Sequence, residues 1–428
     1  MKNTTKKLTA FLNGAHSVYH AVNLLVRELE TAGYSRLNEG EKWDLQPEGK
    51  YYLTRGGSAV MAFRIPAATP TGFMISASHA DRPTFKIKEN PELTGKYTRL
   101  STERYGGMLI STWLDRPLSI AGRVVVETET GVENKLLDID RDLLLIPNVA
   151  IHMNRKANEG YAWNPAVDTL PLAGSEKAAG KLWKALEKEA GGKILGHDLY
   201  LYVREKASVW GVEEAYISAQ ALDDLQCAWG CTQGFLQAEE SKAIPVLCVF
   251  DSEEVGSASR QGAGSTMMED VLERICKCLD LDIKQLLNRS FMVSADNAHA
   301  MHPNHPEYSD PNNAPVPGDG VVLKFNANQR YTTEGLSAAI FRKLCKEAKV
   351  PVQTYCNRAD LPGGSTLGNI SLAHVSVLSV DLGLAQLAMH SAYETASVQD
   401  SIYLEQAMTA FYSAALEGDP ETALCLAK

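Results

Sequence analysis

The stretch that decides the fold is "PVLCVFDSEEVGS", which spans residues 245–257. It is apolar from Pro245 to Phe250, as expected of a buried strand, and it then places Glu253 beside Glu254. Neighbouring side chains on a strand point to opposite faces, so the two carboxylates need not share a partner. One glutamate could hold a cation while the other takes a proton. Whether a cation binds there depends on the rest of the chain.

Composition limits the classes of protein to consider. The chain has 428 residues, 45% of them apolar, which is ample for a packed core and too many for one simple domain. Its 42 basic and 52 acidic residues give a net charge of −10, and no long basic run suggests a nucleic-acid surface. The apolar runs are too short for a bilayer, no signal peptide is seen, and the scattered cysteines read as reduced thiols. We expect a soluble cytoplasmic protein that binds neither nucleic acid nor membrane.

The pattern of apolar runs predicts an α/β fold. A helix is expected over 13–32, before Gly33, and a Gly-Gly turn joins two strands within 50–65. Apolar strands then alternate with helical patterns, which favours a mostly parallel sheet covered on both faces, an α/β/α domain. The further strands are expected at 244–250, 291–295, 350–355 and 375–380, and the helices at 223–238, 266–281, 333–348 and 398–416.

Residues 90–208 interrupt this alternation. They hold strand-like pieces at 119–127 and 198–205, polar turns and one helix near 176–190. The alternation of strands and helices stops before this region and resumes after it. We therefore expect an inserted, smaller, β-rich domain between residues 1–89 and 209–428, which together form the larger domain.

Acidic residues and histidines collect where the predicted strands end. In open α/β sheets, ligands bind at the carboxyl ends of the strands, so side chains at these positions are expected to converge. One of the predicted helices also starts on two aspartates, Asp223 and Asp224. The residues that end or follow the strands are His79, Asp81, Glu253, Glu254, Asp296 and His390.

These residue types suit a pair of zinc ions, with cobalt or manganese as replacements, because imidazoles and carboxylates are present and thiolates are absent. Three carboxylates, Asp223, Glu254 and Asp296, and one bridging hydroxide would balance the charge of two Zn²⁺ ions. Glu253 would then be left over as a base, and Asp81, at His-x-Asp spacing, would orient the His79 ring.

His16 and His20 also have a spacing that suits a metal, four residues apart on the first predicted helix. No third ligand lies nearby in the sequence, and a site is indicated elsewhere. We therefore interpret both as ordinary surface or packing histidines.

Seven motifs occur along the chain in a fixed order, and together they resemble the aspartyl aminopeptidase family of dinuclear zinc exopeptidases. The resemblance covers nearly the whole chain, including "IPNVAIHMNR" (146–155) within the insert. The motifs are "SASHADRP" (76–83), "ALDDL" (221–225), "FDSEEVGS" (250–257), "SADNAHAMHPN" (294–304), "KFNANQRYTTEG" (324–335), "PGGSTLGNI" (362–370) and "AMHSAYETAS" (388–397).

The resemblance implies that Asp223 bridges two metals, that the peptide bond after it is cis, and that Glu253 is general base and then general acid. Asp224, where relatives commonly have Asn, reads as the start of a helix. The remaining ligands that it implies are His79 and Asp296 for one metal and Glu254 and His390 for the other.

The resemblance also implies an assembly: a catalytic α/β domain interrupted by a dimerisation domain, with dimers building a tetrahedral dodecamer. His152 matches the family's histidine that enters the active site of a neighbouring subunit, where it would stabilise the tetrahedral intermediate. Two other interpretations are a core histidine between Ile151 and Met153, and a direct metal ligand.

Three further residues are candidates for substrate binding. Lys324 lies in an apolar run, where a cation needs an anion unless it lies on an edge strand and reaches solvent. The resemblance places it near the substrate pocket, facing an acidic P1 side chain or a carboxylate of the protein. Gly363 and Gly364 in "PGGST" would line that pocket and allow close approach.

The function expected from the sequence is a zinc-dependent aminopeptidase that releases N-terminal residues from peptides, using a metal-bound hydroxide and a glutamate base. An acidic P1 residue (Asp or Glu) is one preference, and a neutral or basic residue is the alternative. A second possibility is another dinuclear metallohydrolase, such as a carboxypeptidase or deacylase. A third is a non-catalytic self-assembling protein, against which the complete ligand set speaks.

Overall fold

A nine-stranded sheet forms the centre of the molecule in the computed structural model, which describes residues 2–427. Its order is β1-β2-β3-β13-β4-β14-β18-β16-β17. The strands are β1 (Ser35–Arg36), β2 (Lys50–Arg55), β3 (Ala59–Arg64), β4 (Phe73–His79), β13 (Ile244–Phe250), β14 (Phe291–Ala295), β16 (Val321–Phe325), β17 (Val352–Cys356) and β18 (Leu378–Gly383). The four central strands, β13, β4, β14 and β18, are all parallel, and the antiparallel pairs lie toward the two edges. The mostly parallel sheet is confirmed.

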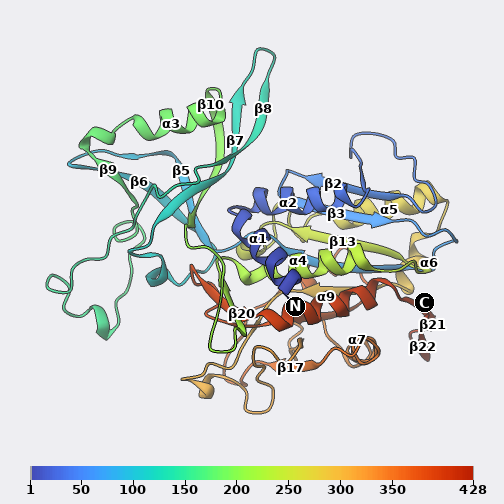
Figure 1. Cartoon of the computed structure of the whole chain (residues 1–428). Helices are drawn as coiled ribbons and strands as arrows, with labels where there is room; N and C mark the ends of the chain where they lie inside the picture. Colours follow the sequence, from blue (N-terminus) through green and yellow to red (C-terminus); the bar gives the residue numbers. More distant parts are fainter. Residues whose placement is uncertain (1, 428) are drawn as a thin grey trace.

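Helices cover both faces of this sheet (Figure 1). Along β13, Leu247 and Val249 enter one apolar core while Val246, Cys248 and Phe250 enter the other, as the alternation of a strand requires. The first face packs against α1 (Lys2–Gly14), α2 (Val18–Thr31), α4 (Leu222–Gln237), α7 (Gly335–Glu347) and α9 (Val398–Tyr412). The second packs against α5 (Met267–Leu279), α6 (Ile283–Asn288) and α8 (Leu367–Ser371). The molecule therefore contains the predicted α/β/α arrangement.

A six-stranded antiparallel sheet, in the order β8-β7-β10-β5-β6-β9, projects from the α/β part (left in Figure 1). Its strands are β5 (Thr84–Leu93), β6 (Tyr97–Tyr105), β7 (Leu118–Glu127), β8 (Val132–Asp138), β9 (Leu172–Ser175) and β10 (Ile194–Val203), with α3 (Lys181–Ala190) beside them. It has an apolar core of its own, which fits the expected β-rich part. Because β5 runs through residue 90, the division at 90–208, which remains a proposal, cuts a continuous strand.

A smaller five-stranded sheet, β11-β12-β20-β19-β15, is a feature that the sequence analysis did not predict. Its strands are β11 (Ser208–Trp210), β12 (Tyr216–Ala219), β15 (Ala298–His299), β19 (Ala385–Leu387) and β20 (Glu394–Ser397), and a separate hairpin joins β21 (Ala415–Asp419) to β22 (Ala423–Ala427). In sequence, β12 precedes Asp223, β15 follows Asp296, and β19 and β20 flank His390. This sheet therefore ties together three segments that carry predicted ligands.

Several helices and strands begin or end at residues other than those predicted. The helix expected over 13–32 is two helices, because Ser17 begins α2 as its N-cap, accepting a hydrogen bond from the His20 backbone N–H. The N-cap of α7 is Glu334 instead of Thr333, since a capping box forms with Ser337. The strand expected from 350 starts later, at β17, because Pro351 has no N–H to donate to the sheet.

The two early histidines have protein partners. His16 Nδ1 lies 2.7 Å from Asp138 Oδ2, and its ring stacks on Tyr202. His20 Nδ1 lies 2.8 Å from Ser17 Oγ, and burial lowers the pKa of His20 to about 4. Both contacts are those of packing histidines. Of the helices within residues 2–427, none combines the length and apolar composition needed to cross a membrane.

Candidate metal centre

The predicted ligands meet at the carboxyl edge of the central sheet. His79 is the last residue of β4, and it stands beside Phe250, the last residue of the parallel strand β13. Glu253 and Glu254 follow β13 in a short turn of 3₁₀ helix, and Asp296 follows β14. Parallel neighbours end at the same edge, so distant parts of the chain arrive at one place.

Asp223 lies at the middle of this cluster. Its Oδ1 is 3.5 Å from His79 Nε2, and its Oδ2 is 3.5 Å from His390 Nε2. His390 Nε2 is also 3.4 Å from Glu254 Oε2. The two oxygens of one carboxylate thus face two different imidazoles, which is the arrangement expected of a residue that bridges two cations.

The donor set fits metal ions. Ligand atoms of His79, Asp223 and Glu254 lie within 4.8 Å of one another, and so do those of Asp223, Asp224 and Asp296. Among the described residues, Asp224 Oδ1 and Glu254 Oε1 are buried without a hydrogen-bond partner. Buried carboxylates that lack donors need a compensating positive charge, and cations held at this cluster would supply it.

Asp224 was expected to start a helix, and it lies in the first turn of α4, where its backbone is not helical. The peptide bond between Asp223 and Asp224 is cis, as expected. Asp224 is fully buried, and its Oδ2 accepts a hydrogen bond of 3.2 Å from the His79 backbone N–H. Asp224 therefore holds the end of β4 in place beside Asp223.

The pKa values of the side chains at the site are shifted because several carboxylates are buried close together. Burial raises the pKa of Glu253 to about 8 and that of Asp296 to about 6. Burial also acts to raise the pKa of Asp223, but the imidazoles of His390 and His79 hold it well below its usual range. Burial tends to lower the pKa of His390, yet Asp223 raises it to about 9. Without cations, this cluster retains protons that bound metals would displace.

Asp81 occupies the position expected of an orienting residue. Its Oδ1 lies 3.2 Å from His79 Nδ1, the ring nitrogen that faces away from Asp223. Asp81 also accepts hydrogen bonds from the backbone N–H groups of Glu253 (3.1 Å) and Glu254 (3.2 Å). One buried carboxylate therefore fixes the direction of His79 and the path of the Glu-Glu turn.

Glu394 is a site residue that the sequence analysis missed. Its Oε2 accepts from the Asp223 backbone N–H at 3.0 Å, and its Oε1 accepts from the His390 backbone N–H at 2.7 Å. It is buried, and burial raises its pKa to about 8. Its place in the same motif as His390, four residues on, was the available signal.

Lys324 faces a carboxylate of the protein. It lies on β16, between β18 and β17, so it is not on an edge strand and does not reach solvent. Its Nζ donates to the backbone oxygen of Asp296 at 2.7 Å and lies 3.5 Å from Asp296 Oδ2. The interpretation of Lys324 as an edge-strand cation is therefore wrong, and the anion it needs is Asp296.

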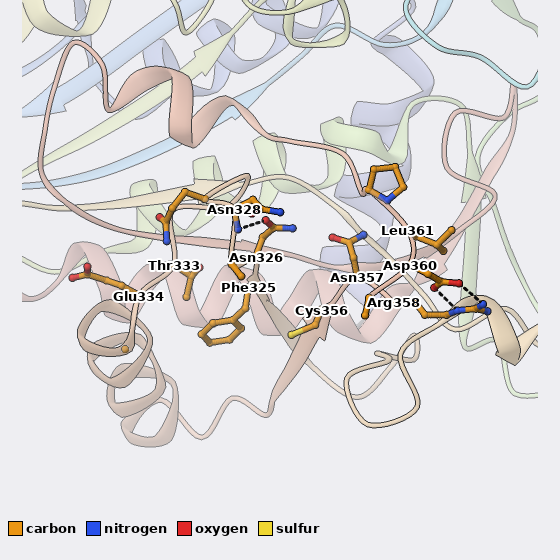
Figure 2. Close-up of a pocket in the computed structure, with 15 residues that line it drawn as sticks. Phe325, Asn326, Asn328, Thr333, Glu334, Cys356, Asn357, Arg358, Asp360 and Leu361 are labelled. Atoms are coloured by element: carbon orange, nitrogen blue, oxygen red, sulfur yellow. Dashed lines mark hydrogen bonds and ion pairs between the residues drawn. The ribbon is translucent and has the colours of Figure 1, made fainter.

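A cavity of about 840 Å³ opens at the carboxyl ends of β16 and β17, between the segments 325–335 and 356–362 (Figure 2). Its lining reaches Pro362 but does not include Gly363 or Gly364, which were expected to line the substrate pocket. At Gly363, where φ is +64°, an added Cβ would lie 2.4 Å from Asn357 Oδ1, whereas Gly364 has open space around it. Glycine is thus required at the first position only.

His152 lies far from a core environment. It occupies an exposed turn of the insert, and its neighbours Ile151 and Met153 are 48% and 83% exposed. The interpretation as a core histidine is therefore wrong. Within the part of the chain that the structure describes, no hydrogen bond or ion pair joins His152 to the metal centre of its own subunit.

Comparison with known proteins agrees with this geometry. Residues 11–412 match the family described as Aminopeptidase I zinc metalloprotease (M18). The chain belongs to the M18 family of zinc aminopeptidases. It is therefore a zinc-dependent aminopeptidase, a hydrolase of peptide bonds, and the resemblance seen in the motifs is confirmed.

Relatives match over nearly their whole length. A probable M18 family aminopeptidase 2 of Clostridium novyi (strain NT) is 42% identical over 432 residues, covering 96% of this chain and 100% of the relative. The solved complex of Ape4 and Nbr1 contains a chain that is 34% identical with a TM-score of 0.93, covering 96% of this chain and 86% of that one. The S. cerevisiae mApe1 dodecamer has a TM-score of 0.85 at 24% identity, covering 96% and 97%, and shows the same fold.

Zinc affinity should rise with pH. His390, with a pKa raised to about 9, and Asp296, with a pKa raised to about 6, must release their protons before they bind a cation. We expect the affinity of the metal-free protein for zinc to fall as pH decreases from 9 to 6, by about tenfold per pH unit for each proton displaced. Titration against a chromophoric chelator measures the affinity, and calorimetry in buffers of different ionisation enthalpy counts the protons. A pH-independent affinity would contradict this assignment.

Proposed function

We propose that two zinc ions bind on either side of Asp223 and that Glu253 carries the proton during removal of the N-terminal residue of a peptide. The observation that supports this proposal is the position of Asp223, with one carboxylate oxygen 3.5 Å from His79 and the other 3.5 Å from His390. Asp296 would complete the first metal position and Glu254 the second. Cobalt or manganese could replace zinc, since the ligands are the same.

Glu253 has the properties of a general base. Bound zinc would polarise the scissile carbonyl and lower the pKa of water. Glu253 Oε2 lies 3.9 Å from His79 Nε2, close to the centre but outside the ligand set proposed above. Burial raises the pKa of this carboxyl group, which suits a group that accepts a proton and later returns it to the leaving amine.

The charge of the centre suits a substrate with a free α-ammonium group. Six carboxylates lie at the centre, and their negative charge exceeds the positive charge of two zinc ions and Lys324; they are Asp223, Asp224, Glu253, Glu254, Asp296 and Glu394. A positively charged amine is attracted to such a site, whereas a free carboxylate is repelled except beside Lys324. This favours an aminopeptidase over a carboxypeptidase or deacylase.

An acidic preference at P1 is part of the proposal. The Lys324 ammonium lies 3.5 Å from Asp296 Oδ2. When Asp296 holds a cation, its negative charge is offset, and Lys324 remains as a buried positive charge beside the site. Such a charge favours a carboxylate on the substrate side chain over a neutral or basic side chain.

Self-association is also part of the proposal, because a neighbouring subunit would contribute a residue to the active site. The turn that carries His152 also exposes Val149, Ile151 and Met153, an apolar group that suits burial against another subunit. A related yeast enzyme forms a dodecamer. We extend this to the present chain as dimers that build a tetrahedral dodecamer, with the insert, residues 90–208, as the dimerisation domain and His152 entering the neighbour's site. The cysteines are all free, which agrees with a cytoplasmic location.

Replacing Glu253 by Gln should abolish turnover while zinc stays bound. The substitution keeps the shape of the side chain and removes the base, so kcat should fall by about 10²–10⁴-fold. Metal analysis of the same sample should give the wild-type zinc content, two ions per subunit. Acetylation of the substrate's α-amine should abolish cleavage by the wild type. Near-normal turnover of the zinc-loaded variant would exclude this mechanism.

Mixing two inactive variants tests whether His152 acts across subunits. His152→Ala and Glu253→Gln should each be inactive alone. In mixed dimers, the site that retains Glu253 would receive His152 from the Glu253→Gln partner, so random mixing should restore about a quarter of the wild-type activity. Co-expression with two different tags isolates the mixed assemblies. Full inactivity of the mixed assemblies would show that His152 acts within its own subunit, and normal activity of His152→Ala alone would show that it has no part in turnover.

The P1 preference can be measured with aminoacyl reporter substrates. We expect kcat/KM to be about tenfold or more higher for Asp and Glu than for Ala or Lys. Lys324→Met should reduce this ratio, because it should lower kcat/KM most for the Asp and Glu substrates. The Ala substrate is the internal control: if the substitution disturbed Asp296, kcat/KM would fall for all substrates alike. The highest kcat/KM for Ala or Lys in the wild type would exclude the acidic preference.

A further inference from the structure

The end of β6 brings the inserted sheet into the metal centre. Residues Tyr105, Gly106 and Gly107, which we name the β6 segment, contact three different parts of the site. We propose that the β6 segment positions both zinc-binding imidazoles, with Tyr105 as a positioning residue that acts through Asp81. The inference rests on the proposed zinc ligands. It adds that residues outside the α/β part, at the end of a strand of the antiparallel sheet, orient them.

Tyr105 holds Asp81. Its hydroxyl donates to Asp81 Oδ2 at 2.7 Å, while Asp81 Oδ1 lies 3.2 Å from His79 Nδ1. The Tyr105 ring is held in turn by an edge-to-face contact with Tyr200 of β10, with ring centres 5.6 Å apart. Because Asp81 also accepts from the backbone of the Glu-Glu turn, rotation of this carboxylate would disturb both His79 and that turn.

Gly107 acts on the other imidazole. Its carbonyl oxygen lies 2.5 Å from His390 Nδ1, so this nitrogen carries the proton and donates. His390 Nε2, which faces Asp223 and Glu254, is thereby left with its lone pair for a cation. The backbone continues the contact, since the Leu109 N–H donates to the His390 carbonyl at 2.9 Å.

Gly106 allows the segment to approach this closely. Its φ is +75°, and an added Cβ would lie 3.1 Å from Glu254 Cβ. At Gly107 the φ is not in the left-handed region, and an added Cβ would lie at an ordinary 3.8 Å from His390 Nδ1. A side chain is therefore strained at Gly106 and tolerated at Gly107, which contacts His390 through its backbone carbonyl.

Tyr105→Phe removes the donor and keeps the ring. We expect its zinc affinity, measured by competition with a chromophoric chelator, to fall about 10–100-fold, with kcat reduced and KM nearly unchanged. Tyr200→Phe is the matched control: it removes the hydroxyl of the edge-to-face neighbour and leaves the Asp81 contact intact, so it should bind zinc like the wild type. In a double-mutant cycle with Asp81→Asn, the two losses should be strongly non-additive, because Tyr105 acts through Asp81.

A glycine pair provides a test that does not depend on the tyrosine variant folding. Gly106→Ala should weaken zinc binding, and Gly107→Ala should leave it unchanged. Wild-type zinc affinity in Tyr105→Phe, additive losses in the cycle, or equal effects at the two glycines would overturn the inference. If the wild type itself holds no zinc, the proposed function fails; if it does and Tyr105→Phe holds zinc equally well, this inference alone fails.

Discussion

Burial of several carboxylates around Asp223 is the constraint on which the rest of the structure depends. Asp223, Asp224 and Glu394 are each almost fully buried, in a place where unpaired negative charge is strongly unfavourable. The protein answers with backbone N–H groups directed at Asp224 and Glu394, and with imidazoles directed at Asp223. These contacts leave carboxylate oxygens close to one another, and cations bound there would offset their charge.

The fold meets this constraint by ending strands at one edge. Parallel pairing of β4, β13 and β14 delivers His79, the Glu-Glu turn and Asp296 to the same height. Parallel pairing alone does not deliver Asp223, at the start of α4, or His390, between β19 and β20. The small sheet brings both to the site, because β12, which precedes Asp223, pairs with β20, and β20 pairs with β19. Catalytic geometry here is a product of two sheets meeting.

The sequence predicts those features that depend on the pattern of side chains, and it misses those that depend on the backbone. The strands at 244–250 and 291–295 were predicted to the residue, since both are mainly apolar runs that end before an aspartate, whereas the strand expected at 375–380 is Leu378–Gly383 and continues past Asp381. The small sheet was missed because strands of two to four residues have no periodicity to detect. Gly107 was missed for a related reason: it acts through its carbonyl, which every residue has. Glu394 lies in one of the quoted motifs, but its partners are backbone N–H groups, which the sequence pattern does not reveal.

The antiparallel sheet contributes directly to the metal centre. The turn that carries His152 is exposed, while the β6 segment, at the end of a strand of this sheet, contacts that centre. Because the contacts with Asp81 and His390 both lie at the end of one strand, any change in how the insert sits is felt by both imidazoles at once. The antiparallel sheet and the metal centre are therefore joined through the end of β6.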